Sequence, residues 1–359
     1  MSTLYSPSGT SPILRITSPQ VEIPKISSED LLERAYHPVR MDLKQVETFL
    51  RDQLESKVEG VPQMMAYLIE SGGKRIRPLV TCLLARAAGY RGKDHIPLAC
   101  VAELLHTATL YHDDVVDDAT LRRGKPTANQ MFGNKIIVLA GDLMLAHSFA
   151  LLMDGGFFSA SQALSHTVKQ MVEGEILQLQ SEGNLETTIY DYMEIIEDKT
   201  ASLFSWCGKA AAVIADQPDK IEPLSQFGYQ LGIAFQLVDD IIDFTGDEEQ
   251  TGKGLFKDLM EGKITLPLLL VLEKNPQLKE PLKNELKEIH QKTSKIDLST
   301  YSTLHKVKQI TRESWVKEQC NYYVENAIDQ ARNALSILDS SRYRTSIFSL
   351  LEYLTQRDR

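Results

Sequence analysis

Cysteine is scarce in this 359-residue sequence: there are four, far apart, and no Cys-x-x-Cys pair occurs. This scarcity excludes a disulfide framework and a cysteine zinc site, and it favours buried thiols in a reducing compartment. The sequence also lacks a basic tract, and its net charge of -10 argues against non-specific binding of nucleic acid. We find no signal-peptide segment and no apolar run as long as a membrane span. The sequence therefore predicts a soluble, cytoplasmic protein.

The N-terminal segment differs in composition from the rest. The stretch "MSTLYSPSGTSPILRITSPQ" is rich in Ser, Thr and Pro and carries one basic and no acidic residue. Such a composition buries too little apolar surface to fold, so we expect a disordered tail over residues 1–35. A transit peptide is the alternative interpretation, which a single Arg supports weakly. We assign residues 36–359 to one domain because no linker divides them.

The remaining sequence has the pattern of consecutive helices. Apolar residues recur at three- and four-residue steps, as at Leu98, Val101 and Leu105. Turn residues separate these segments, and Thr187 or Thr188 can cap the helix that follows them. We see neither strand alternation nor a solenoid repeat. The pattern predicts an all-α fold, a single large helical bundle.

Two clusters of aspartates stand out. The first, "LYHDDVVDDA", begins at Leu110, and the second, "FQLVDDIIDF", repeats its spacing after another apolar run. On a helix, Asp113 and Asp117 share one face, while Asp114 and Asp118 form the adjacent row. Like charges at this spacing destabilise a helix by about 0.2–0.5 kcal/mol per pair. A solvated helix end explains one such cluster, but two of them indicate facing walls that bind Mg²⁺ together with phosphate oxygens.

Basic residues flank both clusters. Arg binds phosphate through two parallel hydrogen bonds, and glycines allow close approach of the backbone to a phosphate. Each group of basic residues, taken alone, is most simply explained as part of an exposed loop. Three such groups beside two aspartate clusters predict a site that holds a diphosphate. The basic residues are Lys74, Arg75, Arg77, Arg122, Arg123, Lys125, Lys253, Lys257 and Lys263.

The order of these motifs resembles that of the polyprenyl synthetases, the trans-isoprenyl diphosphate synthase family, in its long-chain type. The matching pieces are "GGKRIRP", "HTATLYHDDVVDDATLRRGKPTAN", "AGD", "EGE", "DKTASLF", "GIAFQLVDDIIDFTGD" and "KDLMEGKITLPLL". The resemblance implies an isoprenoid synthase fold around a deep central cavity, usually in a homodimer. It also implies Mg²⁺-dependent, head-to-tail condensation of isopentenyl diphosphate with an allylic diphosphate, for quinone side chains, with membrane contact for release of the product.

The resemblance further implies roles for individual residues. Those that hold or support Mg²⁺, roughly three ions to a site, are Asp113, Asp114, Asp117, Asp239, Asp240 and Asp243. Those that bind the diphosphates are Arg122 for the allylic substrate and Lys74, Arg77, His106 and Arg123 for isopentenyl diphosphate. Those that line the site and stabilise developing charge are Lys199, Thr200, Gln236, Lys253 and Lys263. Without the resemblance, His106 would be a core histidine and Lys199 a surface residue.

The sequence departs from the family after the second aspartate cluster, where it reads "GKGLFKDL". Gly254 stands where Pro is common, and Phe256 stands where Gly is common. The length of this loop and Lys253 are kept. We therefore expect altered rigidity over the site and no loss of activity.

Small residues before the first cluster predict a long product. Side chains on a helix lean toward its N-terminus, so Ala108 and Thr109 lie below the first cluster and leave room for a growing tail. Short-chain members of the family carry bulky aromatics at this level. We expect octaprenyl within a heptaprenyl-to-decaprenyl range, with a deeper floor formed by Met144, Leu145 or Leu164.

Other functions stay open. A shorter-chain geranylgeranyl or farnesyl diphosphate synthase would share all the motifs. A terpene cyclase shares an aspartate-rich motif, but it has no second substrate to hold on basic loops. A non-catalytic subunit of a heteromeric synthase would tend to lack the aspartate clusters, and both are present here.

Overall fold

The computed structural model describes residues 26–70, 72–122, 124–245, 257–291 and 300–357, and nearly all regular structure in this part is helical. The expected all-α fold is thereby confirmed. In chain order the elements are α1 (Ser28–Tyr36), η1 (His37–Val39), α2 (Arg40–Asp52), α3 (Val61–Glu70), α4 (Ile76–Ala87), α5 (His95–Val116), β1 (Leu121–Arg122), β2 (Lys125–Pro126), α6 (Ala128–Phe132), α7 (Asn134–Asp154), α8 (Phe158–Ser181), α9 (Ile189–Ile196), η2 (Glu197–Ala201), α10 (Ser202–Ile214), η3 (Pro218–Lys220), α11 (Ile221–Thr245), α13 (Lys257–Met260), α14 (Leu266–Lys274), η4 (Pro276–Leu278), α15 (Lys279–Gln291), α16 (Ser302–Thr311), α17 (Ser314–Ala334), η6 (Leu335–Ile337) and α18 (Arg342–Thr355).

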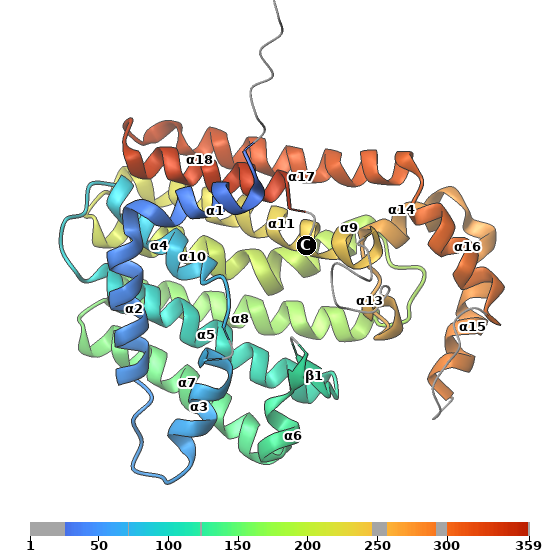
Figure 1. Cartoon of the computed structure of the whole chain (residues 1–359), viewed down its shortest axis with the longest axis horizontal. Helices are drawn as coiled ribbons and strands as arrows, with labels where there is room; N and C mark the ends of the chain where they lie inside the picture. Colours follow the sequence, from blue (N-terminus) through green and yellow to red (C-terminus); the bar gives the residue numbers. More distant parts are fainter. Residues whose placement is uncertain (1–25, 71, 123, 246–256, 292–299, 358–359) are drawn as a thin grey trace, which may run out of the picture.

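The long helices form the centre of the molecule, and α15 and α16 project from one end (Figure 1). α5 packs along α7, and α11 packs along both α10 and α17. Glycines bring α10 and α11 close together: a side chain at Gly208 would collide with the backbone of Leu224, and one at Gly228 with the backbone of Phe204. This close packing fixes where the C-terminal half of α11 emerges, and with it the second aspartate cluster.

The predicted disordered segment overlaps the first helix. We expected disorder to residue 35, but Ser28–Tyr36 forms a helix on which Leu31 and Ala35 are buried. This helix packs against α18, near the other end of the chain. A partner so distant in sequence cannot be read from local composition, which explains the error. Residues 1–25 lie outside the described part of the chain.

A short hairpin follows the first aspartate cluster. We expected no strands, but β1 and β2 pair antiparallel, with Leu121 opposite Pro126 and Arg122 opposite Lys125. Gly124 has a φ of +75°, a conformation that side chains rarely adopt, and so it permits the tight turn. The hairpin folds the chain back toward the end of α5.

A helix start at Thr187 or Thr188 was predicted, and the structure shows that Thr188 is the cap. Its backbone N–H donates to the Asp191 carboxylate at 2.8 Å, and its hydroxyl accepts from the Asp191 N–H at 3.2 Å. This reciprocal capping box fixes the beginning of α9. The helix then continues directly into η2, a π-helical turn.

One helix contradicts our estimate of the apolar runs. By length and composition alone α7 is apolar enough to cross a membrane, and about a third of this apolar stretch is buried. It is the sole such helix in the described ranges. Our prediction that no run reaches this length was therefore wrong. One face of α7 packs on α5, while Ile136, Leu139 and Leu143 are exposed.

Candidate active site

The first aspartate cluster lies at the C-terminal end of α5. Asp113 is inside the helix, and Asp117 is its C-cap, with a backbone N–H that donates to the Asp113 carbonyl at 2.8 Å. Asp118 is exposed and has a φ of +47°, so it has left the helix. Our expectation that Asp114 and Asp118 form a second helical row was wrong, because the helix ends at Val116.

Asp114 is fully buried beneath this helix end. Its Oδ1 accepts from Arg122 Nε at 2.8 Å, and its backbone carbonyl accepts from Asn129 Nδ2 at 3.1 Å. The hairpin thus returns Arg122 to the cluster that precedes it in the sequence. The structure brings these two predicted groups together, with the guanidinium bound to the buried carboxylate.

The π-helical turn η2 presents Lys199 to the first cluster. The Lys199 ammonium lies 3.8 Å from Asp113 Oδ2. It also pairs with Glu175 and donates to Gln178 Oε1 at 3.3 Å. α8 can approach this closely because a side chain at Gly174 would collide with the Lys199 backbone. Inserted π turns are frequent at functional sites, and this one aims a cation at a carboxylate.

Burial and charge alter the proton affinity of this cluster. Burial raises the pKa of Asp113 from 3.8 to about 6; Lys199 opposes the rise and Glu175 adds to it. Lys263 donates to Asp117 Oδ2 at 2.9 Å. Although burial works against its charge, Asp117 raises the pKa of Lys263 above its ordinary value. The first cluster is therefore dense enough in negative charge to attract two lysines from distant parts of the chain.

The second aspartate cluster lies within α11, near its C-terminal end. Asp239 Oδ1 lies 2.5 Å from Arg357 Nη1, so the last described residue of the chain pairs with this cluster. Asp243 Oδ2 accepts from the backbone N–H of Asp258 at 3.2 Å. These contacts join the cluster to the C-terminus and to α13.

Asp240 connects the two halves of the site. It is buried and accepts from Tyr192 Oη at 2.6 Å and from Gln236 Nε2 at 2.8 Å. Gln236 Oε1 in turn accepts from Thr200 Oγ1 at 2.9 Å. Thr200 directly follows Lys199, whose ammonium faces the first cluster. The π-helical turn is thereby linked to both aspartate clusters at once.

The donor set fits a hard divalent cation. Carboxylate oxygens dominate both clusters, and these are the ligands that Mg²⁺ and Ca²⁺ prefer. Burial, together with the charge of Asp258, raises the pKa of Asp240 well above its ordinary value, as burial does for Asp113. Within the described residues, no group of three or more Asp, Glu, His or Cys side chains is arranged to hold a metal ion. The residues therefore fit an ion that takes further oxygens from a bound diphosphate.

The basic turn before α4 lies at the same end of the molecule. Arg77 stacks on Phe204, with Cζ 4.7 Å from the ring centre. Burial lowers the pKa of Arg77, and nearby negative charges that include Asp239 oppose this shift. Lys74 Nζ donates to Tyr353 Oη at 2.5 Å. Arg77 thus interacts electrostatically with Asp239 of the second cluster, while Lys74 contacts the C-terminal helix α18.

Of three further predicted positions, the structure describes one. His106 is half-buried on α5, and its carbonyl accepts from Thr109 Oγ1 at 2.8 Å. Arg123 and Lys253 lie outside the described residues. The same holds for Gly254 and Phe256, the two departures from the family pattern.

The residues expected to set product length lie in the interior. Ala108 on α5 is 2% exposed, and Met144 and Leu164 are fully buried. Thr109 and Leu145 are half-buried. α7 packs on α5, so Met144 and Leu145 lie on a helix next to that of Ala108, and Leu164 lies on α8, which packs on α7.

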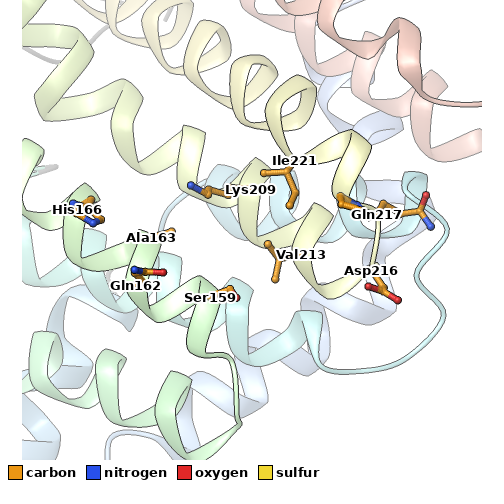
Figure 2. A pocket seen from close by; sticks show the side chains of 10 residues that line it. Ser159, Gln162, Ala163, His166, Lys209, Val213, Asp216, Gln217 and Ile221 are labelled. Carbon is orange, nitrogen blue, oxygen red and sulfur yellow. The ribbon is translucent and has the colours of Figure 1, made fainter.

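A surface pocket of about 460 Å³ lies apart from these groups (Figure 2). α8 contributes Gln162 and His166, α10 contributes Lys209, and the connection to α11 contributes Asp216 and Gln217. None of the predicted site residues lines it. The pocket is therefore separate from the predicted site residues.

Sequence reasoning missed four residues that hold the site together. Glu175 and Gln178 lie three apart on α8, next to a glycine, so the stretch "EGEILQ" contained a detectable signal: two polar groups on one helical face. Tyr192 and Arg357 gave no such signal, because each meets its aspartate only through tertiary packing.

Comparisons with known proteins concern the family and the overall fold. The polyprenyl synthetase family model matches residues 58–302. An all-trans-nonaprenyl-diphosphate synthase (geranyl-diphosphate specific) of Rhodobacter capsulatus is 37% identical over 321 residues, 89% of this chain and 96% of that protein. The octaprenyl diphosphate synthase of Escherichia coli strain K12 is 35% identical over 330 residues, 91% of this chain and 99% of that protein. The crystal structure of a Caulobacter crescentus CB15 polyprenyl synthase, complexed with calcium and isoprenyl diphosphate, is similar with a TM-score of 0.83 and 33% identity, over 91% of this chain and 98% of that one.

Proposed function

The chain belongs to the polyprenyl synthetase family and is a trans-prenyltransferase, and from this premise we propose that it makes a long-chain all-trans polyprenyl diphosphate. The substrates are isopentenyl diphosphate and an allylic diphosphate, joined head to tail. We favour octaprenyl within a heptaprenyl-to-decaprenyl range, which the names of the two relatives support. The product would serve as a quinone side chain.

In this proposal the two aspartate clusters bind Mg²⁺, roughly three ions to a site. When bound, the ions supply Lewis-acid stabilisation of the leaving diphosphate. Asp114 and Asp240 are buried and hydrogen-bonded, so they hold the clusters in place from within the core. The residues that would provide metal ligands are Asp113, Asp117, Asp239 and Asp243.

The basic residues bind and orient the two diphosphates. The allylic C–O bond breaks and its electron pair leaves with the diphosphate, whose charge Lys199, Lys263 and Arg122 stabilise. The double bond of isopentenyl diphosphate attacks the allylic carbon, and a proton then passes to the released diphosphate. Lys74 and Arg77 hold the second substrate within reach, and no nucleophilic side chain takes part. We also assign Arg123 and Lys253 to this site by resemblance.

One observation carries the proposal: the π-helical turn is linked to both clusters, through Lys199 on one side and Thr200 on the other. The test is incubation with labelled isopentenyl diphosphate, Mg²⁺ and allylic primers of different length, with the product length read by chromatography. We expect long-chain products. A cyclic product from one substrate would favour a terpene cyclase, and no turnover without another protein would favour a non-catalytic subunit.

The length of the prenyl product can be tested separately by a substitution at Ala108. A bulky Ala108→Tyr side chain below the first cluster should shorten the main product to roughly the fifteen- to twenty-carbon class, since it blocks the tail and not the chemistry. Ala108→Ser is the control, because it keeps the residue small and should leave the product distribution unchanged. A folded, active Ala108→Tyr variant with unaltered products would mean that the tail takes another path.

We propose a homodimer that covers the exposed side of α7 and α8. Ile136, Leu139 and Leu143 are exposed at helical spacing on α7, and α8 adds a similar row, Val172, Ile176 and Leu179. Two adjacent apolar rows of this kind mark an interaction surface. A Leu139→Glu/Leu143→Glu variant should sediment as a monomer, whereas Met41→Glu, an exposed site on α2, should not. A double variant that stays dimeric would leave this surface to a heterologous subunit or to membrane contact during product release.

A further inference from the structure

Arg75 is held in an unusual backbone conformation between Lys74 and the first turn of α4. It occupies the N-cap position with φ 43° and ψ 40°, the left-handed region. This conformation costs a residue with a side chain about 1–2 kcal/mol relative to the right-handed one. It persists only where the surroundings impose it. Something other than local propensity therefore fixes this turn.

The side chain of Arg75 supplies that constraint. Its Nε donates to Glu47 Oε1 on α2 at 2.6 Å, and its Nη1 donates to Glu103 Oε1 on α5 at 2.7 Å. Its Nη2 donates to the carbonyl of Ile69 on α3. The Arg75 side chain is 15% exposed and that of Glu103 is 7% exposed. One guanidinium thus connects the turn to three other helices in a largely buried setting.

This geometry distinguishes Arg75 from its neighbours. All three of its nitrogens donate within the protein, to two carboxylates and a carbonyl, so its side chain is held by α2, α3 and α5. Glu103 lies one helical turn before His106 on α5, the helix that ends in the first aspartate cluster. The bond to Glu103 therefore sets the distance between the basic turn and the helix that it must face.

We propose that Arg75 is a positioning residue, which anchors the basic turn to α2, α3 and α5 so that Lys74 and Arg77 are aimed at isopentenyl diphosphate. The inference rests on the proposed function, which assigns those two residues to that substrate. Arg75 itself does not touch substrate. Its removal should weaken one substrate selectively, without a matching effect on the other.

The chain offers a matched control in Arg86. This residue also lies on α4, and its ion pair with Asp42 is buried to a similar degree, with side chains 14% and 13% exposed and 2.7 Å between Nη2 and Oδ1. Loss of either guanidinium removes the arginine partner of a buried carboxylate, Glu103 or Asp42, which destabilises the fold. Only Arg75 adjoins the basic turn. A purely structural role therefore predicts equal behaviour of the two variants.

The experiment compares steady-state kinetics and thermal melts of Arg75→Met and Arg86→Met. Both should lower the melting temperature, but only Arg75→Met should raise the KM for isopentenyl diphosphate, by about tenfold or more, with the KM for the primer within about twofold. Arg75→Lys keeps the charge but cannot make three bonds, so its KM should lie between. Equal KM values in the two Met variants would overturn the proposal.

A second comparison keeps the test decisive if Arg75→Met folds poorly. Arg75→Met/Glu103→Met removes both charges, which should restore stability because no lone buried charge remains. The KM for isopentenyl diphosphate should stay high, and its recovery together with the melting temperature would contradict a positioning role. The Lys74→Ala variant distinguishes failure of the substrate assignment from failure of the inference about Arg75. If it leaves that KM unchanged, the substrate assignment fails; if it raises the KM while Arg75→Met does not, only the present inference fails.

Discussion

The two aspartate clusters have the same spacing in the sequence, but the protein supports them in different ways. In the first cluster, which ends a helix, the buried Asp114 is bound by the guanidinium of Arg122. In the second, which lies within a helix, the buried Asp240 is bound by the hydroxyl of Tyr192 and the amide of Gln236. Spacing therefore decides which carboxylates share a face, whereas the tertiary neighbours decide whether charge or neutral hydrogen bonding holds them.

The other two carboxylates of the first cluster, Asp113 and Asp117, are partly buried and each lies close to a lysine. Lys199 and Lys263 both reach the first cluster, at Asp113 and Asp117. In the proposed function, a metal ion held by Asp113 and Asp117 would compete with the two ammonium groups for the same oxygens. Lys199 and Lys263 would then be available to pair with the diphosphate.

The largest expected effect comes from removing one carboxylate charge in either cluster. Asp113→Asn and Asp239→Asn should each lower turnover by about 10²–10³-fold or more, because the leaving diphosphate loses preorganised stabilisation. Labelled isopentenyl diphosphate gives the rate, and circular dichroism checks the fold.

Asp118 provides the control for this prediction. It is exposed and outside the helix, with a φ of +47° that Asn tolerates well. Asp118→Asn should keep most of the activity. A loss as large as that of Asp113→Asn, or activity in EDTA equal to activity in Mg²⁺, would contradict the metal assignment.

Loss of the charged support should be the larger effect on stability. Arg122→Met removes the guanidinium that donates to the fully buried Asp114, and a charged hydrogen bond of this kind contributes about 2–3 kcal/mol. Urea unfolding in EDTA measures the change without metal binding. An Arg122→Met/Asp114→Asn variant should recover part of the loss, because the neutral amide needs no cation; no recovery would count against the pairing.

Loss of the neutral support should be smaller. Tyr192→Phe removes only the hydroxyl that donates to Asp240, and the bond from Gln236 remains. We expect about 1–2 kcal/mol in the same urea assay. Tyr190→Phe is the matched control, since Tyr190 lies on the same helix and is 76% exposed. If Tyr192→Phe destabilises the protein more than Arg122→Met, charged support of Asp114 is not stronger than neutral support of Asp240.

The fold was readable from the sequence where the signal is local. Apolar spacing predicted the long helices, and Thr188 predicted one helix start. One error lies where a distant partner decides the outcome: residues 28–35 are helical because α18 packs against their apolar face. The other is a local signal that was overlooked, the apolar length of α7.

The candidate site could be predicted from the sequence to a similar extent. Aspartate and basic motifs pointed to one region, and the structure places Arg122, Lys199 and Lys263 against the first cluster. No local pattern indicates that Arg357 reaches Asp239, because that contact depends on where the two helices end in space. The spacing of a motif shows which of its residues share a face of one helix. It does not show which side chain of another helix will contact them.

The smallest expected effect is a pH dependence that belongs to the first cluster. Burial raises the pKa of Asp113 from 3.8 in the unfolded chain to about 6 in the fold. Such a group contributes stability that is fully present below the unfolded pKa and is lost as pH rises through the folded value. The metal-free protein should therefore lose about 1–2 kcal/mol from this group between pH 4 and pH 7. Urea unfolding in EDTA at these pH values measures it, with Asp113→Asn lacking that part of the slope and Asp118→Asn retaining it, since Asp118 does not contribute to the raised pKa of Asp113. A slope that is the same in wild type and Asp113→Asn would mean that Lys199 compensates the buried charge fully, and the first cluster would then be no more strained in the absence of metal than the exposed residue beside it.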